Sequence, residues 1–184
     1  MTVLQLIHSD YSRYKKYGSN FFVILFLTQG FWASFQYRIA SFFYKKVKFR
    51  PLKIFIFIPL YFWQKFIEII TGISLPPSAT VGHSFYIGHH GGIILNSETV
   101  IGNNCNISQG VTIGVSGLEE KRGVPIIGNN VYIGANSVVA GKIKIGDNVL
   151  IGACSLVVKD AEDNSVLLGV PAVKISEKSS KGYI

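Results

Sequence analysis

Residues 127–157 read IGNNVYIGANSVVAGKIKIGDNVLIGACSLV, and an aliphatic residue returns at every sixth position. The series is Ile127, Ile133, Val139, Ile145, Ile151 and Val157, and a glycine directly follows four of its members. A period of six fits neither the 3.6-residue turn of an α-helix nor the alternation of a half-buried strand. It suits a stack of three-sided coils, in which each hexad supplies one short strand and one corner. The inward aliphatic residues then form one continuous apolar column, so no single coil is stable alone.

The same pattern continues upstream of residue 127. Aliphatic residues recur in phase at 101, 107 and 113, and earlier at 81 and 87. A two-residue insertion after residue 88 shifts the phase to Leu95, and a second insertion of eight residues falls between Ile113 and Ile127. Asparagine, aspartate and glycine occupy the expected corners, where a positive φ costs these residue types little. An ordinary β-sandwich, with turns every roughly 8–12 residues, is the competing interpretation, and the strict phase of the hexads argues against it.

The remainder of the chain has a different composition. The 184 residues carry a net charge of +8, with 48% hydrophobic and 15% charged residues. Residues 1–71 hold ten Lys or Arg against two acidic residues, whereas residues 72–184 hold eight of each sign. Of the 24 aromatic residues, 20 also lie before residue 72. We therefore divide the chain into a basic, aromatic region at 1–71, a repeat domain at 72–175 with a loop at 115–124, and a tail at 176–184.

The basic region is predicted to be helical, with helices at about 20–29, 31–48 and 51–70 between glycine and proline breaks. Two interpretations stay open for it. In one, the helices pack on the coils around an oligomer axis. In the other, which we favour, they lie in a membrane interface with their Lys and Arg at anionic headgroups. A nucleic-acid partner is not expected, because large apolar residues interleave with the basic ones.

Other features limit compartment and chemistry. The first 20 residues are polar and basic, so no cleavable signal peptide is expected. The longest apolar runs, Phe21–Leu27 and Ile54–Trp63, fall short of the roughly 18–20 residues that span a bilayer. Cys105 and Cys154 lie inside the repeat, so we expect both to be buried, reduced and structural in a cytoplasmic protein. No metal-ligand spacing and no nucleotide-binding glycine loop is present, so we expect no metal.

The hexads, together with His89-His90-Gly91-Gly92 and Gly169-Val170-Pro171-Ala172, resemble the hexapeptide-repeat acyltransferase superfamily. The resemblance implies a left-handed parallel β-helix with an N-terminal helical region, and usually a homotrimer. Residues 82–175 look like the catalytic half of serine acetyltransferases, and still more like the O-acetyltransferases of capsule and exopolysaccharide clusters.

The resemblance also implies site residues. His90 takes the position of the general base, and histidine is the side chain whose ordinary pKa suits that role near neutral pH. His89 stands beside it as a second functional candidate. Acetyl-CoA is the implied co-substrate, and its pantetheine arm would approach small residues in a groove. The matching positions are Gly114, Gly134, Ala135, Gly152 and Ala153, with Lys159 as a phosphate contact.

Departures from the serine acetyltransferase pattern bear on the acceptor. Ser74 and His89 stand where that family carries aspartates. The Arg-His pair of that family's extended loop aligns near Gly123-Val124, so its second histidine is missing here. We therefore expect a sugar hydroxyl of a polysaccharide, or of its lipid-linked precursor, at the cytoplasmic face of the cell membrane. Serine O-acetylation in cysteine biosynthesis is the first alternative. A non-catalytic β-helix scaffold or binding module is the alternative of another class.

Overall fold

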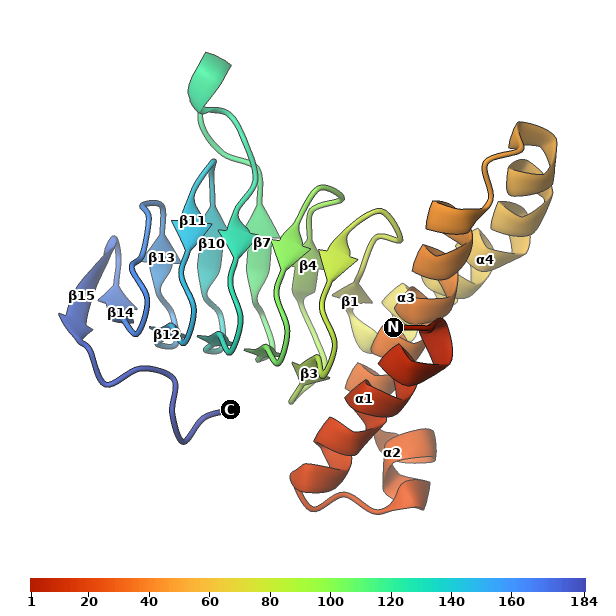
Figure 1. Ribbon diagram of the computed structural model, residues 1–184, viewed down its shortest axis with the longest axis horizontal. Helices are drawn as coiled ribbons and strands as arrows, with labels where there is room; N and C mark the ends of the chain where they lie inside the picture. The colour runs from red at the N-terminus through yellow and green to blue at the C-terminus, as the bar shows by residue number, and fades with distance from the viewer.

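Short parallel strands build the β-helix in the computed structural model, which describes residues 1–184 (Figure 1). Sheet A contains β1 (Ile73–Ser74), β4 (Ile93–Leu95), β7 (Thr112–Gly114), β10 (Val138–Ala140) and β13 (Leu156–Val157). Sheet B contains β2 (Thr80–Val81), β5 (Val100–Ile101), β8 (Ile126–Ile127) and β11 (Lys144–Ile145). Sheet C contains β3 (Tyr86–Ile87), β6 (Asn106–Ile107), β9 (Tyr132–Ile133), β12 (Leu150–Ile151) and β14 (Val166–Gly169), with β15 (Ala172–Ser176) antiparallel at its end. The chain visits the sheets in the order A, B, C once per coil, and the fold is the expected left-handed parallel β-helix.

The aliphatic residues of the hexads form the core, as the six-residue period predicted. In sheet C, Ile87 pairs in register with Ile107, which pairs with Ile133, and all three are buried. Equivalent columns run through sheets A and B, and the three columns merge into one apolar cluster. Burial of this cluster stabilises the stack of coils, because each apolar square ångström removed from water contributes about 25 cal/mol.

An asparagine ladder holds the corner between sheets B and C. Asn104, Asn130, Asn148 and Asn164 all have a φ between 54° and 63°, in the left-handed region. Their side-chain amides donate to one another at 2.6, 3.0 and 3.2 Å down the stack. Asparagine suits this position because it tolerates a positive φ and can also bond to its equivalent in the next coil.

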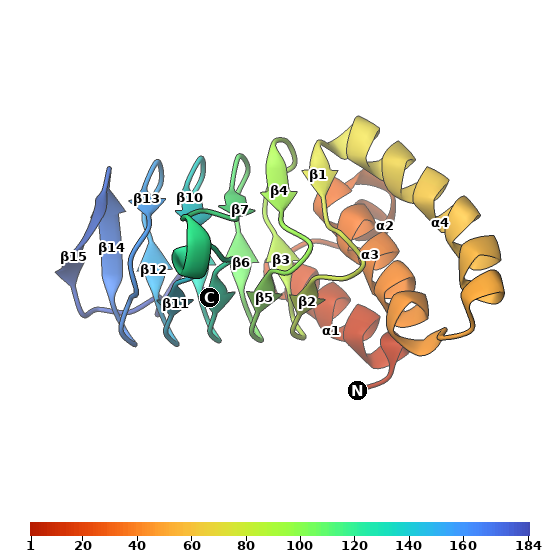
Figure 2. The same ribbon diagram turned by 90° about the horizontal axis from the view of Figure 1, so that it is seen from above.

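The four helices lie together at one end of the β-helix (Figures 1 and 2): α1 (Val3–Lys16), α2 (Phe21–Leu27), α3 (Gln29–Lys46) and α4 (Arg50–Thr71). The last three match the predicted helices closely, but α1 was not predicted. Its signal was a capping box, in which the Thr2 hydroxyl accepts from the Gln5 amide and the Gln5 side chain accepts from the Thr2 amide.

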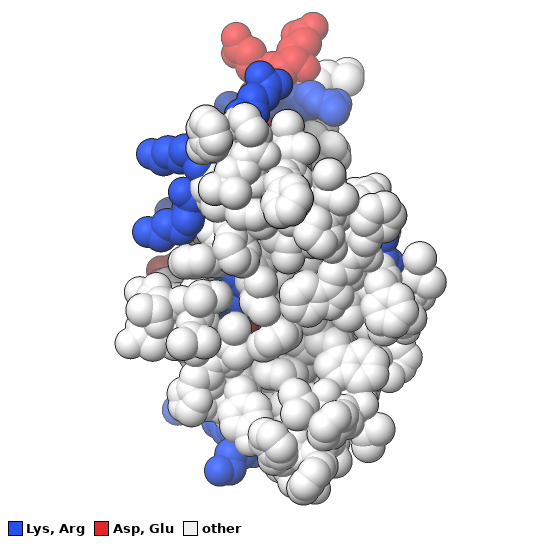
Figure 3. Space-filling view, turned by 90° about the vertical axis from the view of Figure 1, so that its right-hand side faces the viewer, with Lys and Arg blue, Asp and Glu red and all other residues white.

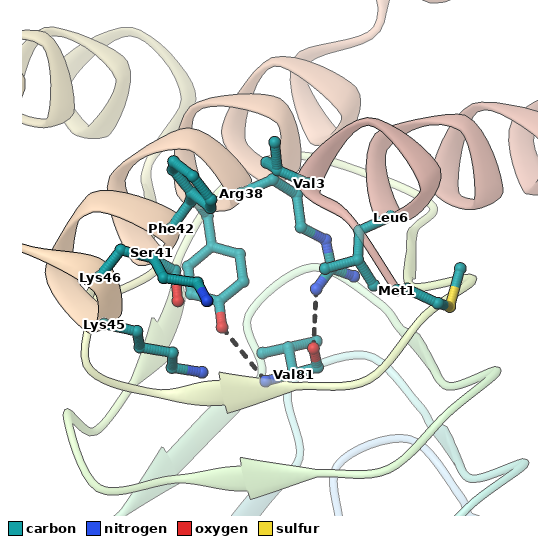
Figure 4. Close-up of a pocket in the computed structure, with 10 residues that line it drawn as sticks. Met1, Val3, Leu6, Arg38, Ser41, Phe42, Lys45, Lys46 and Val81 are labelled. Carbon is teal, nitrogen blue, oxygen red and sulfur yellow. Dashed lines mark hydrogen bonds between the residues drawn. The ribbon is translucent and has the colours of Figure 1, made fainter.

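A buried ion pair docks α1 and α3 on the first coil. Arg38 donates to both carboxylate oxygens of Asp10, at 2.7 and 3.0 Å, and also to the carbonyl oxygens of Val81 and Gly82. Figure 4 shows the bond between Arg38 and Val81. The Tyr37 hydroxyl accepts from the Val81 amide at 3.1 Å. A pocket of about 170 Å³ opens next to these groups. Arg38 uses its donors on protein acceptors, so we assign it to holding the helices on the β-helix.

Helix α4 differs from the expectation that no segment is long enough to span a membrane. By length and composition alone α4 could cross one. The expectation failed because Gln64 and Lys65 end the apolar run in the sequence, whereas the helix continues to Thr71. One such helix is weak evidence for a membrane span.

Candidate functional site

The two adjacent histidines lie in the turn that joins sheet C to sheet A in the first coil. His89 and His90 follow β3 and precede β4, and both side chains are exposed. Gly91 and Gly92 complete the turn with φ values of 100° and 66°, which only glycine adopts readily. The Gly91 carbonyl accepts from the Gly110 amide at 2.8 Å, so the longer turn is anchored to the next coil.

The turn that carries the histidines has unpaired backbone donors. The amides of residues 89–92 donate no hydrogen bond within the chain, whereas the flanking amides of Gly88 and Ile93 are both paired. Unpaired amides beside a candidate base are suited to bind an oxyanion, because they present fixed dipoles without reorganisation.

The end of α4 abuts this turn and brings in a carboxylate that the sequence did not identify as part of the site. The Gly72 carbonyl accepts from the Ile93 amide at 3.0 Å, and a Cβ built on Gly72 would lie 3.1 Å from Gly91 Cα. Glu68, one turn earlier, accepts at 2.9 Å from Ser74, the residue that stands where the resemblance implies an aspartate. Ser74, which replaces that aspartate, therefore has the Glu68 carboxylate as its hydrogen-bond partner.

The surroundings of Glu68 keep it ionised. Its burial raises the pKa, but hydrogen bonds from Lys65, Gln64 and Ser74 outweigh burial and place the pKa below its usual value. Glu68 is the single acidic residue between Asp10 and Glu98. That isolation, just before the first coil, was the sequence signal that could have indicated it.

The small residues expected to contact CoA occupy two edges of sheet A. Ala135 and Ala153 lie at the same corner as the histidines, two and three coils farther along, where the Cys154 amide donates to the Ala135 carbonyl at 2.8 Å. Gly134 and Gly152 precede them at this corner. Gly114 ends β7 at the opposite edge, where the loop 115–124 begins.

Packing of the coils requires glycine at one of these positions but not at another. A Cβ on Gly134 would lie 2.6 Å from the Ala153 amide nitrogen, so coil stacking itself requires glycine there. A Cβ on Gly114 would meet nothing closer than Thr112 Cγ2 at 3.9 Å, and its φ is not in the left-handed region. Packing does not explain Gly114, and the space beside its α carbon is open to a ligand.

Lys159 lies apart from the histidines, at the far end of the β-helix. It lines a hollow of about 600 Å³ with two other lysines and three acidic residues, so the local charge is balanced. The loop 115–124 projects from the coil as expected (Figure 1), with Ser116 and Gly123 paired at its base through two 3.1 Å backbone hydrogen bonds.

The cysteines differ from one another. Cys105 is buried as expected, and its burial raises the pKa of its thiol to about 12. Cys154, also expected to be buried, is exposed. The expectation was wrong because Cys154 takes the corner position with a φ of 58°, as Asn136 does one coil earlier, rather than the inward position of the hexad. No group of three or more His, Cys, Asp or Glu residues is arranged to hold a metal ion.

Known proteins similar to this chain share both its repeat and its helices. The family of bacterial transferase hexapeptide (six repeats) matches residues 125–159. A Bacillus subtilis serine acetyltransferase is 30% identical over 166 residues, which cover 88% of this chain and 71% of the relative. A Bacillus pumilus serine acetyltransferase is also 30% identical, over 83% of this chain and 66% of the relative. The chain covers only 43% of a Synechococcus elongatus serine acetyltransferase, at 32% identity.

Solved structures give the same result. The crystal structure of Neisseria gonorrhoeae serine acetyltransferase superposes with a TM-score of 0.82 at 30% identity, over 95% of this chain and 65% of that one. The Brucella abortus serine acetyltransferase gives a TM-score of 0.78 at 29% identity, over 96% and 68%.

These relatives overturn the expected kinship with capsule and exopolysaccharide O-acetyltransferases, and with it the expected polysaccharide acceptor. The acceptor inferred from Ser74 and His89 was therefore wrong. The loss of the aspartate did not leave position 74 without a carboxylate beside it, because Ser74 donates to Glu68. The chain belongs to the serine acetyltransferase family of hexapeptide-repeat transferases.

Proposed function

We propose that this protein is a serine O-acetyltransferase that uses acetyl-CoA. Its relation to the serine acetyltransferases over most of its length carries the proposal. A solved relative in complex with serine, 30% identical, and one in complex with CoA, 25% identical, support the choice of the two substrates.

His90 acts as the general base in this proposal. Its imidazole takes the proton from the serine hydroxyl as the oxygen attacks the thioester carbonyl of acetyl-CoA. The tetrahedral oxyanion is bound by the open amides of residues 89–92. Collapse breaks the carbon–sulfur bond, and the CoA thiolate takes the proton back from the imidazolium. The acetyl group passes directly to serine, with no covalent enzyme intermediate.

The groove for acetyl-CoA follows the small residues of sheet A. Ala135 and Ala153 place only short side chains along the corner that carries the histidines, and Gly114 leaves open space at the other edge. Small residues allow a pantetheine chain to approach the backbone closely. Lys159 remains a proposed contact of the CoA phosphates.

The carboxylate of Glu68 supports serine as the acceptor. An ionised carboxylate near the acceptor site favours the ammonium group of an amino acid. We assign Glu68 a positioning role through Ser74, with which it shares a hydrogen bond.

A homotrimer completes the site. Both histidines are exposed on the single chain. The loop 115–124 projects away from its own coil, so it can cover part of a neighbouring subunit. The principal hollows of the single chain include neither histidine.

The test is CoA release from acetyl-CoA by the purified full chain, with and without L-serine. We expect serine-dependent release that falls about a hundredfold or more in His90→Ala, the usual loss on removal of a general base. His83→Ala is the matched control, since His83 lies at another corner, and it should retain activity. Absence of serine-dependent release overturns the proposed substrate, and a loss confined to His89→Ala moves the base to the neighbouring residue.

A further inference from the structure

Helix α4 carries two apolar stripes, and only one of them is covered. The inner stripe packs on α3, where Trp63 lies edge to face with Phe35 at a centroid distance of 6.2 Å. The outer stripe repeats at helical spacing and consists of Phe55, Ile58, Phe62, Phe66 and Ile69. These five side chains are between 54% and 81% exposed.

Helix α2 extends the same apolar surface. Phe22, Phe26 and Leu27 are between 59% and 71% exposed. A wholly apolar hollow of about 220 Å³ joins α2 to α4, lined by Leu25 on one side and by Trp63 on the other. We call the outer stripe of α4, the exposed face of α2 and this hollow the apolar end face. Figure 3 shows it as a broad surface with few charged side chains, with Lys and Arg along much of its edge and Asp and Glu mainly at the top of the view.

The exposed unpaired charge that the helical region places around the apolar end face is of one sign. Six exposed cations lie at the helix ends that border it: Lys15, Lys16, Lys45, Lys46, Lys48 and Arg50. The only two acidic residues before residue 72 are already paired, Asp10 with Arg38 and Glu68 with Lys65. An apolar face with a cationic rim complements a surface of acyl chains and anionic headgroups.

A second copy of the chain fits this face less well. Two copies that met face to face would bring their cationic rims together without any free carboxylate to pair with. Like charges opposed across an interface cost several kcal/mol, so charge disfavours that occupant.

The geometry favours a helix that lies in the membrane interface over one that crosses it. One side of α4 is packed against α3, and Gln64, Lys65 and Glu68 lie near its C-terminal end. The helix leads into β1 through Gly72. The Gly72 carbonyl accepts a hydrogen bond from Ile93 in β4, the strand of sheet A in the second coil. Insertion across a bilayer would require the helix to leave α3.

We propose that the apolar end face binds the surface of membranes that contain anionic phospholipids, such as the cytoplasmic leaflet. Phenylalanines of α2 and α4 enter the acyl boundary, and the six lysine and arginine side chains contact headgroup phosphates. The β-helix then projects from the membrane, with its last coil farthest away, as the positions of the helices and the last coil indicate (Figure 2).

Flotation of the full chain with vesicles tests this binding. We expect the protein to float with vesicles of phosphatidylcholine and phosphatidylglycerol, and far less with phosphatidylcholine alone. The triple variant Phe55→Ser, Phe62→Ser, Phe66→Ser should partition about a hundredfold less, because it removes three apolar anchors. The matched control is Leu118→Ser with Val173→Ser, which removes exposed apolar side chains elsewhere and should float like the parent.

Two outcomes overturn the proposal. One is the absence of flotation with either vesicle. The other concerns the mass of the particle in solution without lipid. If this mass is half as large for the triple variant as for the parent, a second copy covers the face. Circular dichroism and serine-dependent CoA release confirm that the triple variant is folded. Failure of the proposed acetyl transfer would leave the flotation result unaffected, since none of these residues lies in the candidate site.

Discussion

Gly114 and Gly134 both stand in the proposed CoA groove, but the fold requires only one of them. We expect Gly114→Ala to fold with unchanged stability, within about 0.5 kcal/mol, and to raise the KM for acetyl-CoA about tenfold. Gly134→Ala should instead lower the free energy of unfolding by about 1–3 kcal/mol, because its Cβ meets the Ala153 amide. Urea unfolding and steady-state kinetics of both variants measure the difference. An unchanged KM in Gly114→Ala would remove that residue from the groove.

Glu68 should act on the reaction through Ser74. Glu68→Gln removes the charge of the acceptor but keeps its shape, so the hydrogen bond from Ser74 becomes weaker. We expect the KM for serine to rise about tenfold while the KM for acetyl-CoA and the free energy of unfolding stay nearly unchanged. Lys65→Gln is the control, since it removes the exposed partner of the same carboxylate and leaves Ser74 in place. A fall in the free energy of unfolding with an unchanged KM for serine would assign Glu68 a purely structural role.

The difference between these residues explains how far the sequence could predict the site. His89 and His90 were visible because they interrupt a strict repeat beside a phase shift. Glu68 was not, because its relation to Ser74 crosses the junction between a helix and the first coil, and no periodic pattern spans that junction. Cys154 was misjudged because inward and corner positions both accept small residues, and only φ separates them.

At the scale of elements, the β-helix was predictable and the helical end only in part. Each hexad predicts its own strand and corner. An ambiguous residue in one coil is therefore outweighed by the equivalent residues of the neighbouring coils. Helices have no such redundancy. Helix α1 is polar and its cap is a single Thr2–Gln5 pair, which is easily overlooked. Helix α4 keeps Pro59 in its interior and continues past Gln64, against the local signals for its end.

Docking of the helices depends on side chains that sequence patterns do not reveal. Asp10 lies 28 residues from Arg38 and binds it within the protein interior, and the same carboxylate accepts from the Phe85 amide of the first coil. Asn106 is also buried, between Arg13 of α1 and the chain's last residues. These polar contacts orient a largely apolar helix bundle on the β-helix, since hydrogen bonds are directional and apolar contact is not.

At the scale of the whole molecule, the C-terminal tail connects both ends of the coil stack. The Ser179 amide donates to the Asn164 carbonyl, the Ser180 amide to Asn148, and the Ser180 hydroxyl to Asn130. The Tyr183 carbonyl then accepts from Asn106 in the second coil and from the Tyr17 hydroxyl of α1. The tail therefore crosses one coil after another, whereas every strand contacts only its neighbours.

Removal of the tail should weaken the cooperation between distant coils. We expect truncation after Glu177 to lower the free energy of unfolding by about 2 kcal/mol, for about two net hydrogen bonds, and the Tm by about 4–8 °C. The urea m-value should also fall, because end coils can then unfold separately. Ser180→Ala, which keeps the tail and loses one hydroxyl, should show a smaller loss with an unchanged m-value. A truncated chain that unfolds at the parent's Tm and m-value would mean that the apolar column alone makes the stack cooperative.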